Sequence, residues 1–135
     1  MSLHRTISLV VAFSVGIMLA LFAFDWVADP EPAMQRAREE AVVRSTREIL
    51  RSYIAGDIEI VDPLATRRAV GKAYIYPADD GWEVSGHYRR DASDRWHPFL
   101  MALDAKATLV MLSVRDSDAA LAARAMNDPR LSVSR

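Results

Sequence analysis

The chain has 135 residues, no cysteine and only two lysines, Lys72 and Lys106. The lack of cysteine excludes disulfide bonds, thiolate metal sites and thiol chemistry. The two lysines leave few candidates for covalent catalysis through a Schiff base. Glycine is also scarce, and none of the five glycines belongs to a phosphate-binding loop or a dinucleotide-binding fingerprint. These absences predict a protein that is not an enzyme and that needs no cofactor.

An excess of charge of one sign is missing too, because the formal net charge is −1. Domains that bind nucleic acid usually carry a clear basic excess, so no nucleic-acid partner is expected. Hydrophobic residues make up 51% of the chain and charged residues 26%. This composition is typical of a folded domain and not of a disordered chain.

One long hydrophobic run is present near the amino terminus, with no charged residue from Ile7 to Phe24. As a helix it would extend about 27 Å, close to the thickness of the hydrocarbon core of a bilayer. The sequence that follows, FDWVADP, lacks the A-x-A pattern of a signal-peptide cleavage site. We therefore predict a transmembrane helix over residues 7–27 that stays in the lipid bilayer. Cleavage of this segment is the alternative.

The charges on either side of the run predict its orientation. Arg5 precedes it, whereas Asp25, Asp29 and Glu31 follow it. Because positive residues favour the cytoplasmic side, residues 1–6 should be cytoplasmic and residues 28–135 should form a periplasmic or extracellular domain. The expected location is the inner (plasma) membrane, crossed once.

Small residues recur every four positions within the run and would line one stripe of a helix. They are Ser8, Ala12, Gly16 and Ala20. Such a stripe lets a second helix approach closely, which predicts a membrane-protein partner or a homo-oligomer. The alternative is that small residues are simply common in membrane helices.

Beyond the membrane segment, periodicity predicts an α+β domain. Residues 33–55 carry an apolar stripe opposite charged i, i+4 pairs, which indicates an amphipathic helix. Strand patterns follow at residues 58–61, 70–76, 82–90, 95–103 and 108–114, and a short helix at 118–126. In the clearest strand, Trp82 and Tyr88 should face the core. The predicted fold is a helix packed on a 4–5-stranded antiparallel sheet, with a short C-terminal helix.

Histidines and arginines supply the candidate sites of this domain. His87 and His97 lie on neighbouring predicted strands and are weak candidates for a metal site, because their spacing matches no common ligand motif. Two arginine pairs could meet at one edge and bind a partner or an anion: Arg67, Arg68, Arg89 and Arg90. A solvated surface is the alternative for both sets. Glu83, Ser85 and His87 share a strand face, but the spacing is too wide for a catalytic triad.

The predicted order of one membrane helix, one exported helix and a small sheet resembles that of bitopic accessory proteins such as respiratory-complex assembly factors. The resemblance is one of topology, with no shared motif. We expect a single-pass accessory or assembly protein whose exported domain binds a partner. An exported domain that binds a small ligand or a metal is the alternative.

Overall fold

A computed structural model describes residues 15, 17–19, 31–64 and 73–135. The chain divides into two compact units, Met1–Ala37 and Arg38–Arg135. In the first unit, residues 15 and 17–19 are helical. The rest of the predicted membrane segment lies outside the described residues, together with Ser8, Ala12, Gly16 and Ala20. Among the described residues, no helix combines the length and the hydropathy that crossing a membrane requires.

The first long element is the helix α2 (Glu31–Tyr53), which confirms the helix predicted over residues 33–55. Pro32 lies in its first turn, where the missing N–H costs nothing. The buried residues of α2 recur every three or four positions, as an amphipathic helix requires: Val42, Val43, Thr46, Leu50 and Tyr53. The helix ends shortly before Gly56, whose φ of 96° suits a glycine.

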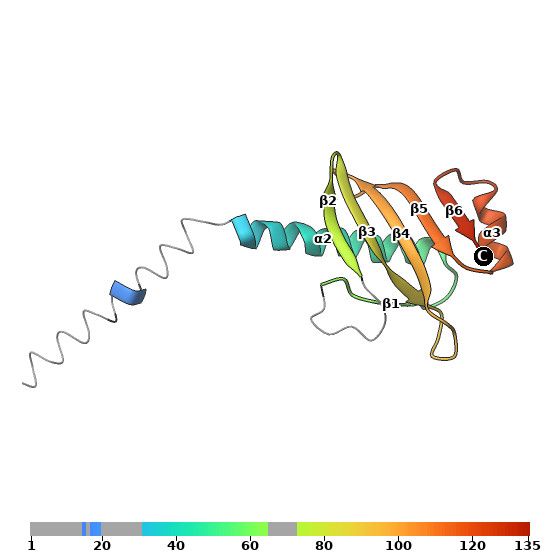
Figure 1. The fold of residues 1–135 in the computed structure, drawn as a ribbon, viewed down its shortest axis with the longest axis horizontal. Coiled ribbons are helices and arrows are strands. Elements are labelled where there is room, and N and C mark those ends of the chain that lie inside the picture. The colour runs from blue at the N-terminus through green and yellow to red at the C-terminus, as the bar shows by residue number, and fades with distance from the viewer. Residues whose placement is uncertain (1–14, 16, 20–30, 65–72) are drawn as a thin grey trace, which may run out of the picture. The chain divides into compact units, whose positions relative to one another are not determined.

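Six strands form one sheet. Their bounds are β1 (Glu59–Ile60), β2 (Tyr74–Ala78), β3 (Gly81–Arg89), β4 (His97–Asp104), β5 (Leu109–Arg115) and β6 (Leu131–Ser134). Both β1 and β2 pair antiparallel with β3, at different places along it. The order then continues through β4 and β5 to β6 (Figure 1).

The α+β class is confirmed, but the prediction of 4–5 antiparallel strands with a C-terminal helix is wrong in two respects. The sheet is mixed, because β6 pairs parallel with β5. The short helix α3 (Ala119–Ala125) is not the last element but lies in the crossover between these two strands. A parallel pair needs such a crossover. Prediction missed β6 because four residues with two apolar positions resemble an ordinary tail.

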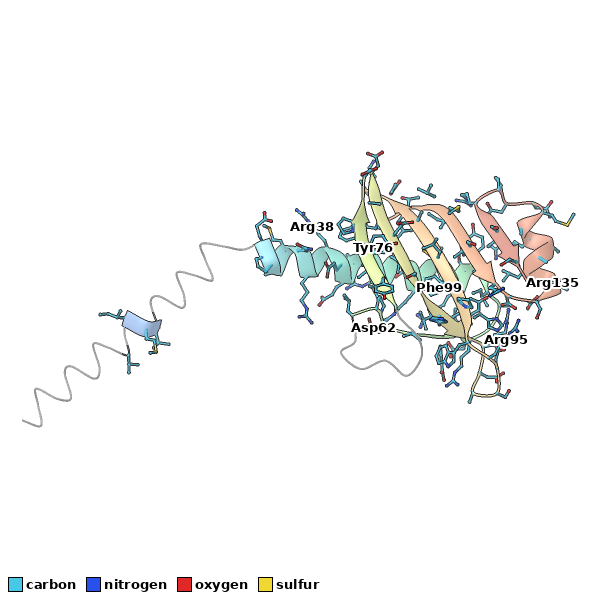
Figure 2. All side chains as sticks on the ribbon, in the orientation of Figure 1. Arg38, Asp62, Tyr76, Arg95, Phe99 and Arg135 are labelled. Atoms are coloured by element: carbon cyan, nitrogen blue, oxygen red, sulfur yellow. The ribbon has the colours of Figure 1, made fainter. Side chains whose placement is uncertain are left out.

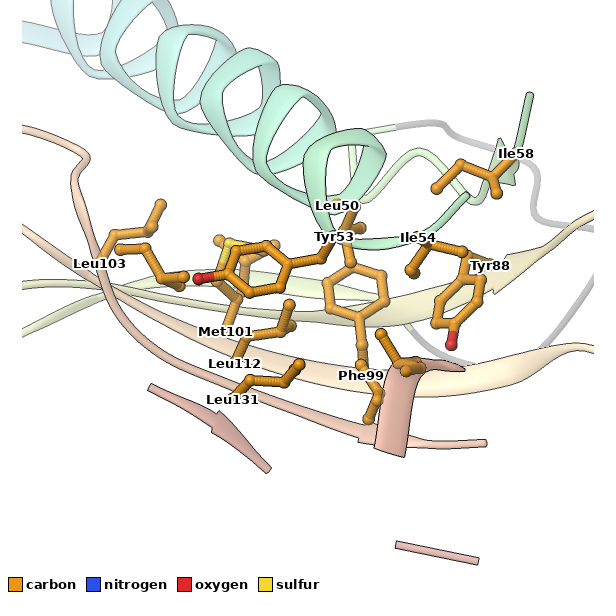
Figure 3. Packing of buried hydrophobic residues seen from close by; sticks show 14 of the residues in the cluster. Leu50, Tyr53, Ile54, Ile58, Tyr88, Phe99, Met101, Leu103, Leu112 and Leu131 are labelled. Carbon is orange, nitrogen blue, oxygen red and sulfur yellow. The ribbon is translucent and has the colours of Figure 1, made fainter. Parts of the chain in front are cut away.

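The hydrophobic core lies between α2 and one face of the sheet. Alternate residues of the central strands, such as Val84, Met101 and Leu112, are buried on this inner face. Figure 3 shows Leu50 of α2, and Ile54 directly after the helix, packing toward Met101 and Leu112. Burying each such side chain contributes about 1.5–3 kcal/mol, so this contact dominates the stability of the domain. Trp82 and Tyr88 belong to the same cluster, which confirms the predicted inner face of β3.

The end of α2 is tied to the region around α3 by polar contacts. The hydroxyl of Tyr53 donates a hydrogen bond to Asp128 Oδ2 at 2.5 Å. Arg124 donates to the carbonyl oxygen of Ser52 at 2.7 Å, and its guanidinium lies 4.3 Å from the centre of the Tyr53 ring. A cation at the last carbonyl groups of a helix is favourable, so this clasp stabilises the end of α2.

Candidate binding surface

Two sets of side chains, rich in charged groups, lie at the end of the sheet where β3 and β5 finish and β4 begins. Tyr88 is opposite His97 across the β3–β4 pair, and His87 is opposite Pro98. Successive side chains of a strand point to opposite faces, so each face of this end receives a different set. We call the set on the α2 side the inner cluster: Tyr88, Arg90, Asp94, His97, Asp116 and Asp118. The set on the other side is the arginine hollow: Arg95, Trp96, Pro98, Arg115 and Arg135.

Asp116 is the centre of the inner cluster, and only 2% of it is exposed. Its Oδ2 accepts hydrogen bonds from the Tyr88 hydroxyl at 2.5 Å and from Arg90 Nη2 at 2.7 Å. The same Nη2 donates to Asp118 Oδ2 at 3.1 Å. Asp118 is also the N-cap of α3, where its other carboxylate oxygen accepts from the backbone N–H groups of Ala120 and Leu121. The cluster therefore connects the ends of β3 and β5 to the start of α3.

His97 is also buried, with 3% exposed. Its ring stacks on that of Tyr88 with centroids 5.2 Å apart. Its Nε2 lies 3.1 Å from both carboxylate oxygens of Asp94, and its Nδ1 lies 3.2 Å from the carbonyl oxygen of Arg115. Both ring nitrogens thus face hydrogen-bond acceptors, and neither is free to bind a metal ion.

The charges of the inner cluster are mutually satisfied. Burial by itself would raise the pKa of Asp116, but the hydrogen bonds from Arg90 and Tyr88 outweigh it, and the pKa is lowered. Burial and the hydrogen bond to Asp116 raise the pKa of Tyr88. At neutral pH the carboxylate therefore stays ionised and the phenol protonated. The contacts of Asp116 with Arg90 and Tyr88 therefore stabilise this end of the sheet.

The arginine hollow on the other face has a volume of about 390 Å³. Its residues come from the β3–β4 hairpin, the end of β5 and the segment after β6. Figure 2 shows Arg95 and Arg135 at this end of the domain. Arg115 Nε donates a hydrogen bond to the main-chain oxygen of Arg135 at 3.5 Å. Among the described residues, no carboxylate side chain lines the hollow.

Trp96 is held at the hollow by a neighbouring arginine that has its own partner. The guanidinium of Arg89 lies 4.6 Å from the centre of the Trp96 ring. Arg89 Nε also donates to Glu59 Oε2 at 2.6 Å. Glu59 therefore balances Arg89 on the neighbouring strand β1, and the indole ring is fixed as part of the wall.

A second exposed feature is the outer sheet face, which we define by Tyr74, Tyr76, Leu100 and Met111, with Val110 at the bulge of β5. Tyr74 pairs with Ser85 and Tyr76 with Glu83, so both tyrosines point away from the core. The exposed fractions are 45% for Tyr74, 43% for Tyr76, 54% for Val110 and 42% for Met111. In Figure 1, α2 runs behind the strands, and no described helix covers the opposite face of β2–β5.

The sequence-predicted site residues are not brought together as pairs. His87 and His97 point to opposite faces of the sheet, because their register partners are neighbours in sequence. Arg90 belongs to the inner cluster, whereas Arg89 lies on the other side against Trp96. Arg67 and Arg68 lie outside the described residues, so the four-arginine patch stays a prediction. The described part of the chain holds no group of three potential metal ligands among its His, Asp and Glu residues.

Two features of this end of the sheet were missed from the sequence. The arginines of the hollow are twenty residues apart, and only the β4–β5 pairing and the parallel β6 bring them together. No local motif signals this. Asp116 lies just before the N-cap of α3, Asp118, and matches no local motif either. A buried acid cannot be recognised before its partners Arg90 and Tyr88 are placed.

A larger hollow, of about 670 Å³, lies at the opposite end of the sheet. Its wall mixes both signs of charge, with Asp79, Asp80 and Asp104 near Arg38 and Lys106. The local excess of positive charge that distinguishes the arginine hollow is absent from this wall.

The chain matches no protein-family model, no curated protein and no solved structure.

Proposed function

We propose that this protein is a single-pass accessory protein of the inner (plasma) membrane, whose domain outside the cytoplasm binds another membrane protein. The outer sheet face carries the proposal. The hydrophobic run over residues 7–27 and the charges around it support the membrane location. The lack of catalytic motifs supports a role in assembly or interaction.

The composition of the outer sheet face is that of a binding surface. Where one face of an antiparallel sheet is solvated, its outward positions are usually polar. Here they include two tyrosines and a methionine, residue types that are enriched at protein interfaces. Glu83 accepts a hydrogen bond from Tyr76, which raises the pKa of the phenol and orients the ring. A partner that covers this face would bury these side chains.

The small-residue stripe supports a second contact with the same partner inside the membrane. Ser8, Ala12, Gly16 and Ala20 would let a partner helix approach closely. Replacing Gly16 with Leu should then reduce co-purification of the partner in mild detergent. A homo-oligomer formed through this stripe is the competing arrangement.

Photo-crosslinking in intact membranes tests the outer sheet face. A photoreactive amino acid is placed at Tyr76 or Met111, with Ala123 on α3 as an exposed control position. We expect one discrete adduct with the same membrane protein from both outer positions and none from Ala123. The adduct should disappear with Met111→Asp when the probe is at Tyr76. Equal labelling from all three positions, or labelling of lipid alone, would contradict the proposal.

Location is tested separately. The full chain should resist extraction from membranes at alkaline pH, and protease added from the non-cytoplasmic side should remove the domain. Release at alkaline pH would favour cleavage of residues 7–27 and a free exported domain. The partner contact on the sheet would then still be open to the crosslinking test.

The arginine hollow favours a second function, binding of a small anionic ligand by the exported domain. A metal ion has no comparable support, because His87 and His97 lie on opposite faces. The two functions use different residues and can be removed by different substitutions.

A further inference from the structure

Among the described residues, no Asp or Glu side chain forms an ion pair with the arginines of the hollow. Glu59 is engaged by Arg89, while Asp94 and Asp116 are engaged by Arg90 and His97 on the other face. Holding several guanidinium groups around one space is unfavourable without an anion. The hollow is therefore suited to a negatively charged group supplied from outside.

The wall of the hollow is not charged throughout, which restricts the kind of anion. Trp96 and Pro98 supply an aromatic and an aliphatic surface beside the arginines. The volume of about 390 Å³ is in the range of small-molecule pockets, roughly 300–1,000 Å³. A bare inorganic anion would leave much of this space empty. The fit is better for an organic molecule with an anionic end.

We propose that the arginine hollow binds a small organic phosphate monoester, with its phosphate among Arg95, Arg115 and Arg135 and its organic part against Trp96. Guanidinium groups bind phosphate through paired N–H donors. A phosphate monoester offers three oxygens and up to two charges to three arginines, whereas a carboxylate offers two oxygens and one charge. The monoester can come from a soluble metabolite or from a lipid headgroup, since both present the same group.

This inference names the ligand class of the second function proposed above and rests on it, and it is independent of the proposed partner binding. The hollow shares no residue with the outer sheet face. Loss of the crosslinks at Tyr76 and Met111 would leave it untouched, and loss of phosphate binding would leave the crosslinks untouched.

Calorimetric titration of the full chain, in non-ionic, phosphate-free detergent at low salt, tests the proposal. The probes are phenyl phosphate, glycerol 3-phosphate and benzoate. We expect both phosphates to bind at least tenfold more tightly than benzoate. Arg115→Gln should weaken phosphate binding at least tenfold. The control Arg51→Gln makes the same charge change on an exposed part of α2 and should alter binding less than twofold.

One further variant tests the Trp96 side of the hollow, where the organic part of the ligand should lie. Trp96→Leu should weaken phenyl phosphate more than glycerol 3-phosphate, because only the former can stack on the ring. A preference for glycerol 3-phosphate in the wild type would indicate a lipid-type headgroup, and a preference for phenyl phosphate a soluble aromatic monoester. No binding of either phosphate at millimolar concentration would overturn the proposal. So would equal losses in Arg115→Gln and Arg51→Gln when both variants unfold at the wild-type temperature.

Discussion

The inner cluster and the arginine hollow occupy opposite faces of the same end of the sheet, yet their arginines differ in one decisive respect. Arg90 contacts the carboxylates of Asp116 and Asp118. Arg95 and Arg135, within the described residues, have no carboxylate partner among the ion pairs. A charge with partners inside the fold stabilises the fold, whereas a charge that lacks one is available to a ligand.

Strand alternation produces this difference between residues that are adjacent in sequence. Arg115 belongs to the hollow, and the next residue, Asp116, is the centre of the inner cluster. His97 and Pro98 likewise point to opposite faces of the sheet. One residue of register therefore decides whether a side chain at this end of the sheet is buried with partners or exposed on the other face.

The largest expected effect is that of removing the buried acid. Asp116→Ala leaves Arg90 and the Tyr88 hydroxyl without their main acceptor, and loss of one partner of a buried ion pair costs about 3–5 kcal/mol. Urea denaturation of the full chain in detergent, followed by fluorescence, measures this loss. Arg95→Gln is the matched control from the hollow. Equal stability of the two variants would mean that the buried acid stabilises the fold no more than an exposed arginine of the hollow does.

Acid should act on the inner cluster through the same carboxylate. The pKa of Asp116 is lowered in the folded state, so its stabilising contribution is present above the unfolded-state pKa, about 3.9. The contribution is lost as the pH falls through the folded-state pKa. Urea midpoints measured between pH 7 and pH 3 should fall less in Asp116→Asn than in wild type. Asp94, whose pKa is also lowered, should supply part of the remaining slope. A parallel fall in both proteins would show that Asp116 is not involved.

A smaller effect is expected from Tyr88→Phe. The substitution keeps the ring that stacks on His97 but removes one of the two donors to Asp116 Oδ2. Arg90 still binds the carboxylate, so the loss should be about 1–2 kcal/mol. Thermal unfolding by circular dichroism provides the measurement. A loss as large as that of Asp116→Ala would mean that the hydroxyl, and not the ion pair, holds the cluster together.

The smallest effect is expected from the arginines of the hollow. Arg95→Gln and Arg135→Gln remove exposed groups that have no carboxylate partner, and such substitutions change stability by no more than about 0.5 kcal/mol. The same unfolding experiment checks this, with the calorimetric titration as the functional readout. A clear stability loss would assign these arginines to the fold.

Sequence patterns predicted the elements of the domain well and its sites poorly. The alternation of WEVSGHYRR predicted which residues of β3 face α2, because that face must exclude water along its whole length. The inner cluster depends instead on which strands pair and in what register. A sequence pattern shows toward which face of the sheet a side chain points. It does not show which residue lies next to it on the neighbouring strand. Arg89 and Arg90 were therefore grouped by sequence although their side chains separate.

The clasp at the end of α2 has a consequence for the order of folding. Tyr53 and Asp128 are 75 positions apart in sequence, and Arg124 reaches the Ser52 carbonyl over a similar separation. Closing so long a loop costs entropy that only the completed core can offset. At a synthesis rate of about 5–20 residues per second, α2 emerges several seconds before the residues that cap its end. Until β3, β4 and β5 have also emerged, its apolar stripe has no sheet to cover it. The nascent domain is then most exposed to misassembly. Its apolar stripe needs covering during synthesis and not in the folded protein.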